Sequence, residues 1–201
     1  MKTIYLIRHG STLNHENKEV FRGHEDVKLS EAGEAESYKI ASYFNGISID
    51  AVFSSPLARA RQTAEIITSM QQFKNITVKN ELIDINCGSW QGLDITTVKK
   101  KYPNLFNIWC VSPDIFKMPR GESVVNVQER AFKFINGIIN DDAFESVLIV
   151  THRLLINVIV LAALDIDLKK FWQFRYSPCS VTKLVYDGER FILEQMNSKN
   201  Y

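Results

Sequence analysis

Three short apolar runs of this chain each end in basic residues, and this pattern restricts the possible folds more than any other feature. Each run has the length and composition of a buried strand. The runs are Ile4–Ile7 before Arg8-His9-Gly10, Ala51–Ser54 before Ser55-Pro56-Leu57-Ala58-Arg59, and Val147–Val150 before Thr151-His152-Arg153. Ligands of open α/β sheets bind outside the carboxyl ends of the strands. The pattern therefore predicts a crevice at one end of a parallel sheet, lined by Arg8, His9, Arg59 and His152.

Strand and helix patterns alternate along the chain. We expect strands at residues 3–7, 51–54, 76–79, 147–151, 181–186 and 191–196, and helices at about 30–44, from 56, at 122–139 and at 154–164. Ser30 is expected to cap the first helix, and Pro56 to lie in the first turn of the second. This order predicts an α/β fold, a three-layer α/β/α sandwich with a mostly parallel sheet. The hairpin signal at residues 187–190 adds an antiparallel edge strand.

Composition limits the partners that this chain can have. With 201 residues, of which 45% are hydrophobic, it is long enough for one well-packed domain, taken as 1–201. A net charge of +1 gives no reason to expect nucleic acid or a membrane surface, so the expected partner is a small molecule, with a homodimer left open. The apolar stretch Leu154–Leu164 is too short to span a bilayer. Three cysteines and the absence of a secretory leader favour the cytoplasm.

The cluster of basic residues indicates an anionic ligand. Like charges at one crevice repel each other unless an anion binds between them, and arginine forks favour phosphate. Arg59 and Arg61 point apart on the same helix, so we expect only one of them to face the crevice. The four histidines lack the spacing of a helical zinc site, so we expect no metal and no cofactor, and we interpret His15 and His24 as surface loop residues.

Five segments in order also resemble the histidine phosphatase superfamily, the phosphoglycerate mutase-like enzymes. The matching segments are Leu6–Gly10 for the R-H-G signature, Ser54–Ala64 for S-S-P-L-x-R-A-x-Q-T-A, Asp84–Gly92 for E-x-x-x-G-x-W-E-G, Pro119–Ser123 for P-x-G-E-S, and Val150–His152 for the strand with the second histidine. The resemblance covers nearly the whole chain. It implies a metal-independent phosphoryl transfer in which His9 forms a covalent phosphohistidine, and in which Arg8, Arg59 and His152 hold the phosphoryl oxygens.

The chain departs from the family pattern at several positions. The family's acid is a glutamate, whereas the aligned residue here is Asp84, with Glu81 as the reserve candidate for protonating the leaving alkoxide. Arg153 and Pro178 stand where the family commonly has Gly and Asn. The loop between Gly10 and Gly23 is one residue longer than usual. The phosphate-binding asparagine is therefore taken as Asn14, with His15 in a strict register, and Gly23 is counted with the phosphate-binding residues.

The resemblance leaves three functions open. The favoured one is a histidine acid phosphatase-type phosphomonoesterase, a hydrolase that acts on a small phosphorylated metabolite. The alternatives are a cofactor-dependent phosphoglycerate mutase and a weakly active regulatory or binding protein on the same fold. Residues 93–118 form one helical segment and a short loop, and we expect them to cap the active site, while their aromatic residues pack largely on the domain. Because this segment is short, water can enter, which favours the phosphatase.

Overall fold

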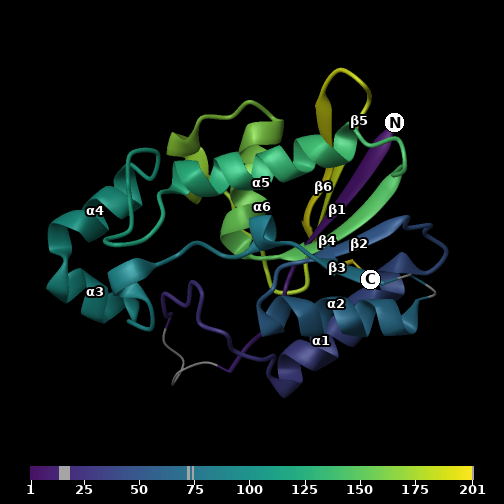
Figure 1. Cartoon of the computed structure of the whole chain (residues 1–201). Helices are drawn as coiled ribbons and strands as arrows, with labels where there is room; N and C mark the ends of the chain where they lie inside the picture. The colour runs from purple at the N-terminus through teal and green to yellow at the C-terminus, as the bar shows by residue number, and fades with distance from the viewer. Residues whose placement is uncertain (14–18, 72, 74, 201) are drawn as a thin grey trace.

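A mostly parallel sheet runs through the middle of the molecule (Figure 1). The computed structural model describes residues 1–13, 19–71, 73 and 75–200. Within this part of the chain, six strands pair in the order β3-β2-β4-β1-β5-β6. Their bounds are β1 (Lys2–Arg8), β2 (Ala51–Ser54), β3 (Ile76–Val78), β4 (Ser146–Thr151), β5 (Val181–Tyr186) and β6 (Phe191–Ser198).

The strand order confirms that the three strands with basic ends are neighbours. β2, β4 and β1 lie side by side and are parallel, so their carboxyl ends face the same way. β5 pairs antiparallel with both β1 and β6. The predicted antiparallel pairing is therefore present at this side of the sheet, but the reversed strand is β5, one position in from the edge, because the hairpin places β6 outside it.

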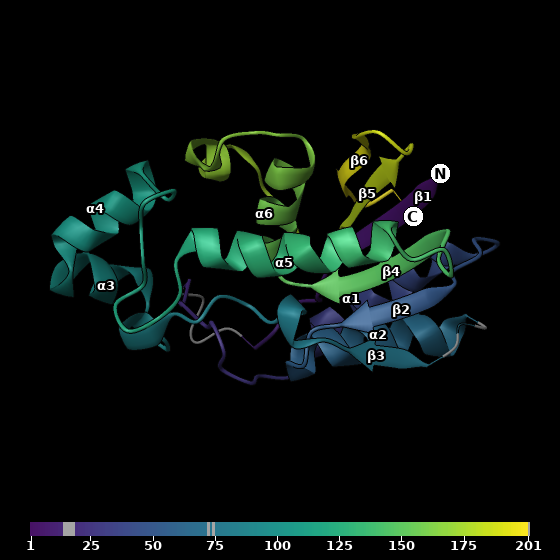
Figure 2. The same cartoon turned by 45° about the horizontal axis from the view of Figure 1, so that its top comes forward.

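Helices cover both faces of the sheet, which confirms the predicted three layers (Figure 2). α1 (Glu31–Ala41) and α2 (Ala58–Met70) lie on one face, and α5 (Val124–Ile139) and α6 (Arg153–Ala163) lie on the other. Short 3-10 helices are η1 (Ser42–Phe44), η2 (Asn80–Leu82), η3 (Gly88–Trp90) and η4 (Leu168–Gln173). None of the described helices is long and apolar enough to cross a lipid bilayer.

Alternation along β1 builds the two cores. Ile4 and Leu6 pack with the α5 and α6 side, whereas Tyr5 and Ile7 pack with α1 and α2. Successive side chains of a strand point to opposite faces, so a strand between two helical layers has to be apolar at every position. Burying each such side chain stabilises the fold by about 1.5–3 kcal/mol. This firmly buried strand holds Arg8 and His9 at its carboxyl end.

α1 and α2 differ in what fixes their first residues. Ser30 caps α1 as predicted, since its hydroxyl accepts a hydrogen bond from the Gly33 amide at 3.2 Å. The prediction for Pro56 was wrong, because α2 begins at Ala58 with Leu57 as its N-cap. The Asp26 carboxylate accepts from the Ala58 amide at 2.6 Å, so a distant loop supplies the cap and fixes where the helix starts.

Two helices occupy the segment after Gly92, where one helical segment was expected. α3 (Ile95–Lys101) and α4 (Pro103–Val111) meet at Tyr102. Pro103 has no amide hydrogen and disfavours helical geometry at the residue before it, so the helix is interrupted there. Both helices lie at the end of the molecule away from the two termini (Figure 1).

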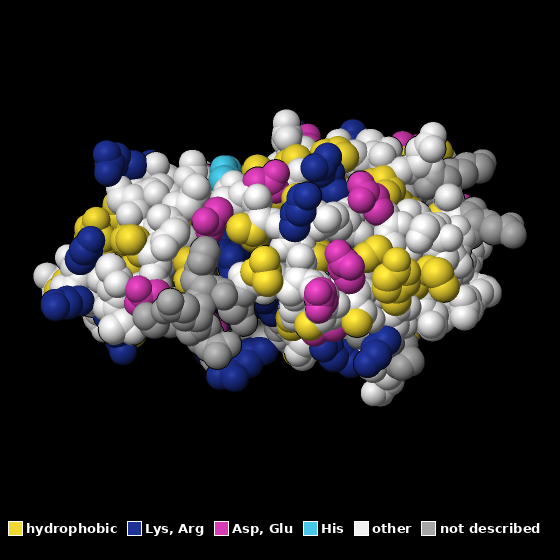
Figure 3. All heavy atoms as spheres, turned by 90° about the horizontal axis from the view of Figure 1, so that it is seen from below, with side chains coloured by type: hydrophobic (Ala, Val, Ile, Leu, Met, Phe, Trp, Pro, Cys, Tyr) yellow, Lys and Arg dark blue, Asp and Glu magenta, His cyan; other side chains and the backbone are white. Residues whose placement is uncertain are grey.

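The face formed by α1 and α2 carries charges of both signs. Figure 3 shows Lys and Arg side chains interspersed with Asp and Glu side chains on this face. Such alternation agrees with the net charge of +1 for the whole chain.

Candidate active site

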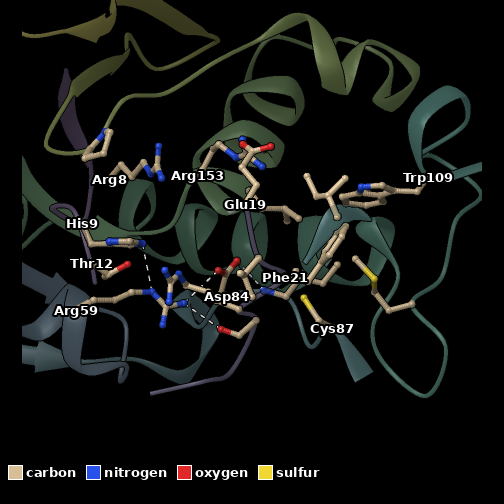
Figure 4. Close-up of a pocket in the computed structure, with 18 of the residues that line it drawn as sticks. Arg8, His9, Thr12, Glu19, Phe21, Arg59, Asp84, Cys87, Trp109 and Arg153 are labelled. Carbon is tan, nitrogen blue, oxygen red and sulfur yellow. Dashed lines mark hydrogen bonds and ion pairs between the residues drawn. The ribbon is translucent and has the colours of Figure 1, made fainter. Parts of the chain in front are cut away.

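A pocket of about 640 Å³ opens at the carboxyl ends of the central strands. This volume lies within the usual range for small-molecule sites. Arg8 and His9 come from the end of β1, Arg59 from the first turn of α2, and Asp84 from the loop after η2 (Figure 4). Residues far apart in the sequence therefore meet where the strand pattern predicted a crevice.

The geometry around His9 defines which of its nitrogens can react. Nδ1 lies 2.7 Å from the Gly10 carbonyl oxygen, which only accepts, so Nδ1 carries the hydrogen. Arg59 donates its Nε–H to Nε2 of His9 at 3.2 Å. Burial, followed by the charges of Arg59 and Arg8, holds the pKa of His9 well below its usual 6.5. At neutral pH His9 is therefore uncharged, with a lone pair on Nε2.

Arg59 is completely buried, and all three nitrogens of its guanidinium group donate hydrogen bonds. Its Nη1 donates to the Glu25 carbonyl at 2.8 Å, and its Nη2 donates to the Gly23 carbonyl at 3.0 Å. Nη2 also lies 3.2 Å from Oδ2 of Asp84. Arg61, by contrast, is exposed on α2 and does not line the pocket. The prediction that Arg59 rather than Arg61 faces the crevice is thus confirmed in its geometry.

Asp84 lies beside Arg59, and the ring of His152 lies beside that of His9, with ring centroids 5.2 Å apart. Oδ2 of Asp84 is 3.7 Å from Nδ1 of His152, and Oδ1 accepts from the Ile85 amide at 2.9 Å. Nε2 of His152 lies 2.7 Å from the Ser55 hydroxyl, which also accepts from the Leu57 amide. Burial and the charge of Arg59 lower the pKa of His152 well below 6.5. His152 is 1% exposed and lies behind the pocket wall rather than among its lining residues.

Among the described residues, two carboxylates line the pocket, namely Asp84 and Glu19. Glu81, the reserve candidate for the acid, has an exposed side chain outside the lining, and its backbone carbonyl accepts from Arg130 at 2.7 Å. Among the two acids proposed from the sequence, geometry therefore favours Asp84.

Buried arginine donors without partners point to an anion. Nη1 of Arg8 donates to the Tyr176 carbonyl at 2.6 Å, but its Nε is buried with no hydrogen-bond partner among the described residues. Nη1 of Arg22 is likewise buried with no hydrogen-bond partner among the described residues. An unpaired buried donor costs about 1–3 kcal/mol, so an anion bound between these side chains would be stabilising. Burial and then the charge of Arg153 lower the pKa of Arg8 to about 10, so Arg8 remains charged at neutral pH.

Four other residues named from the sequence have different outcomes. Gly23 lines the pocket with φ of +49°, and its carbonyl holds Arg59 in place. His24 was wrongly interpreted as a plain surface residue, because it is partly buried and its Nε2 lies 2.9 Å from the Asp84 carbonyl oxygen. Asn14 and His15 lie outside the described residues.

The part of the pocket away from His9 is apolar. Its side chains come from the loop after Thr12, from α3, α4, α6 and η4, and from the loop between α4 and α5, and they are Phe21, Ile95, Phe106, Trp109, Met118, Leu154 and Trp172. Phe106 and Trp109 thus line the pocket, whereas Tyr102 and Phe116 pack against Trp90 in the core. Across the described ranges, no group of three or more His, Cys, Asp or Glu residues is placed to hold a metal ion.

Comparison with known proteins agrees with this arrangement. Residues 4–199 match the family model described as histidine phosphatase superfamily (branch 1). The chain belongs to this superfamily. It is 28% identical to phosphoserine phosphatase 1 of Hydrogenobacter thermophilus, over 98% of this chain and 92% of that protein. It is 24% identical to a probable phosphoglycerate mutase GpmB of Erwinia tasmaniensis, over 92% of this chain and 85% of that protein.

A solved structure shows the same fold. The Bacillus stearothermophilus YhfR structure superimposes with a TM-score of 0.91, at 28% identity and with 98% of each chain covered. The phosphoglycerate mutase-like architecture inferred from the sequence is therefore confirmed.

Sequence reasoning did not find every residue at this histidine phosphatase site. It did not assign roles to Arg22 and Glu19, which line the pocket, or to Ser55, whose hydroxyl lies 2.7 Å from Nε2 of His152. Arg22 immediately precedes Gly23, so a basic residue beside a turn glycine was the available signal. Ser55 belongs to the S-S-P-L-like segment, but nothing in the sequence shows which side chain it contacts.

Proposed function

We propose that this chain is a phosphomonoesterase of the histidine acid phosphatase type that hydrolyses a small phosphorylated metabolite in the cytoplasm through a phosphohistidine on His9. The observation that carries the proposal is the position of one buried guanidinium. Arg59 lies 3.2 Å from Nε2 of the neutral His9 and 3.2 Å from Oδ2 of Asp84. The nucleophile and the carboxyl group are thus both in direct contact with the anion-binding group.

In the first step, the Nε2 lone pair of His9 attacks the phosphorus of the bound ester. The bond between phosphorus and the ester oxygen breaks, and Asp84 in its acid form gives its proton to the leaving oxygen, so that a neutral alcohol departs. Arg8 and Arg59 stabilise the charge on the transferring phosphoryl group. His152 supports this arrangement by packing its ring against that of His9, with ring centroids 5.2 Å apart.

In the second step, water attacks the phosphorus of the phosphohistidine. The bond between phosphorus and Nε2 breaks, the Asp84 carboxylate takes the proton from the water, and inorganic phosphate is released. His9 and Asp84 then return to their starting states, so that one water is consumed for each ester cleaved. Since arginines supply the positive charge, we expect turnover in the presence of a chelator.

A phosphoglycerate mutase is the second candidate, because one of the relatives carries that description. A mutase would transfer the phosphoryl group from His9 back to a substrate hydroxyl instead of to water. The wild-type protein should therefore be given 3-phosphoglycerate, with and without a bisphosphorylated primer, and both products should be measured. Phosphate release without formation of the 2-phospho isomer supports the hydrolase, whereas primer-dependent isomerisation without release contradicts it.

A panel of phosphomonoesters tests the hydrolase directly. Release of phosphate from at least one alkyl phosphate in excess EDTA, with competition by vanadate, is the expected result. Failure to turn over either alkyl phosphates or p-nitrophenyl phosphate would contradict the proposed function and favour a binding protein.

A further inference from the structure

Arg153 is a charged pocket residue that the proposed chemistry does not use. It is the first residue of α6, it lines the pocket, and its side chain is exposed. Within the part of the chain that the structure describes, its guanidinium has no hydrogen-bond or ion-pair partner. Figure 4 shows Arg153 between Arg8 and Glu19 in the drawn view.

Arg153 lies near the proposed phosphate site. It lines the same pocket as Arg8, and it is the first residue of α6, directly after His152. Burial and then the charge of Arg153 lower the pKa of Arg8, so the two guanidinium groups lie close enough to interact. When a phosphoryl group is bound to Arg8, an anionic group held by Arg153 would therefore sit on the alcohol, close to the ester oxygen.

The described side chains that line the pocket carry one positive charge more than a phosphate dianion neutralises. Among the described residues, the lining includes four arginines, Arg8, Arg22, Arg59 and Arg153, and two carboxylates, Glu19 and Asp84. His9 is neutral, and the proposed first step needs Asp84 in its acid form, so the charges of these described side chains sum to about +3. A phosphate dianion neutralises two of these charges. The remaining one matches a single carboxylate.

We propose that Arg153 selects phosphate monoesters whose alcohol carries a carboxylate close to the ester oxygen. This inference rests on the proposed function. A guanidinium binds a carboxylate through two parallel hydrogen bonds, and this pairing is stronger than one between neutral groups. Burial is the main cause of the lowered pKa of Arg8, and the charge of Arg153 is the next, so an anion bound between the two arginines would relieve their repulsion. The apolar end of the pocket then accommodates the rest of the alcohol.

The experiment compares two esters that differ only in the carboxylate, O-phosphoserine and O-phosphoethanolamine. We expect the wild-type kcat/KM to be roughly 10- to 100-fold higher for phosphoserine, the range given by one charge-assisted contact. In Arg153→Gln this ratio should fall toward one, mainly through the KM of phosphoserine, and Arg153→Lys should restore part of it. Arg61→Gln, which changes an exposed arginine outside the pocket, is the matched control and should keep the wild-type ratio.

Binding to the His9→Ala variant gives a second readout that does not depend on turnover. Calorimetry should show tighter binding of phosphoserine by the same factor, and His9→Ala/Arg153→Gln should lose the difference. A wild-type ratio near one, or an unchanged ratio in Arg153→Gln, contradicts the inference while hydrolysis of p-nitrophenyl phosphate leaves the proposed function standing. If no ester is hydrolysed, the proposed function fails, and the binding ratio alone decides the role of Arg153.

Discussion

Arg59 donates its Nε–H to Nε2 of His9 over 3.2 Å, so the proposed nucleophile and the main anion-binding side chain are in direct contact. This contact stabilises a neutral His9, because a positive neighbour disfavours protonation. It also means that a phosphoryl oxygen bound to Arg59 brings the phosphorus close to Nε2. Two backbone carbonyls hold the guanidinium, so this arrangement is preorganised.

Replacement of Arg59 should damage catalysis far more than replacement of Arg61. Arg59→Ala removes the charge-assisted contacts to the phosphoryl group, so we expect a loss of about 2 to 3 kcal/mol or more in transition-state stabilisation. Arg61→Ala should change kcat/KM only slightly, since its side chain is exposed outside the pocket. Steady-state kinetics on p-nitrophenyl phosphate, with thermal unfolding as a check on folding, measures the contrast. Equal losses in two folded variants would show that the wrong arginine was assigned.

The role of Asp84 should depend on the leaving group. p-Nitrophenolate needs little protonation, so Asp84→Asn should retain much of its phosphorylation rate on p-nitrophenyl phosphate. On an alkyl phosphate the loss should approach the 10²- to 10⁴-fold typical of general acid catalysis. Glu81→Gln is the matched control, because Glu81 is exposed outside the pocket. If Glu81→Gln is the damaging variant and Asp84→Asn is harmless on both esters, the acid is Glu81.

Stability should decrease as the pH falls below about 6.5. The buried His9 and His152 have folded-state pKa values well below 6.5, whereas both titrate near that value in the unfolded chain. The unfolded state therefore binds more protons below pH 6.5, and each histidine costs up to about 1.4 kcal/mol per pH unit. Urea unfolding of wild type and His9→Gln between pH 7.5 and 5, in buffers without phosphate, measures the difference. Parallel curves for the two proteins would argue against a neutral buried His9.

Close packing of the loop after β1 against α1 should make Gly33 intolerant of a side chain. A Cβ at Gly33 would lie 1.9 Å from the Ser11 carbonyl oxygen, whereas a Cβ at Gly137 in α5 would meet nothing within 4 Å. Gly33→Ala should therefore displace the Ser11 backbone, lower the unfolding temperature and weaken phosphate binding. Gly137→Ala should instead stabilise the protein by about 0.5–1 kcal/mol. A wild-type unfolding temperature for Gly33→Ala would contradict this packing.

The parts of the fold that follow from local chemistry were predictable. Ser30 could be assigned as a helix cap because capping depends on neighbouring residues. The convergence of Arg8, His9 and Arg59 followed from strand ends in a parallel sheet. Pro56 was misplaced because the start of α2 depends on Asp26, which comes from another loop.

Long-range polar contacts were the features that the sequence could not show. The contact of His24 with the Asp84 carbonyl joins residues 60 positions apart, and that of Ser55 with His152 joins residues 97 positions apart. Hydrophobic periodicity places helices and strands, but it contains no information on which polar side chains meet across loops.

Trapping the phosphoenzyme tests the central claim most directly. Wild-type protein should be mixed with a ³²P-labelled substrate, quenched rapidly without acid and digested, and the labelled peptide should be sequenced. The account predicts an acid-labile, base-stable phosphoryl group on His9, and no labelled protein or turnover from His9→Ala. A fully active His9→Ala variant, or a label on any other residue, would contradict it.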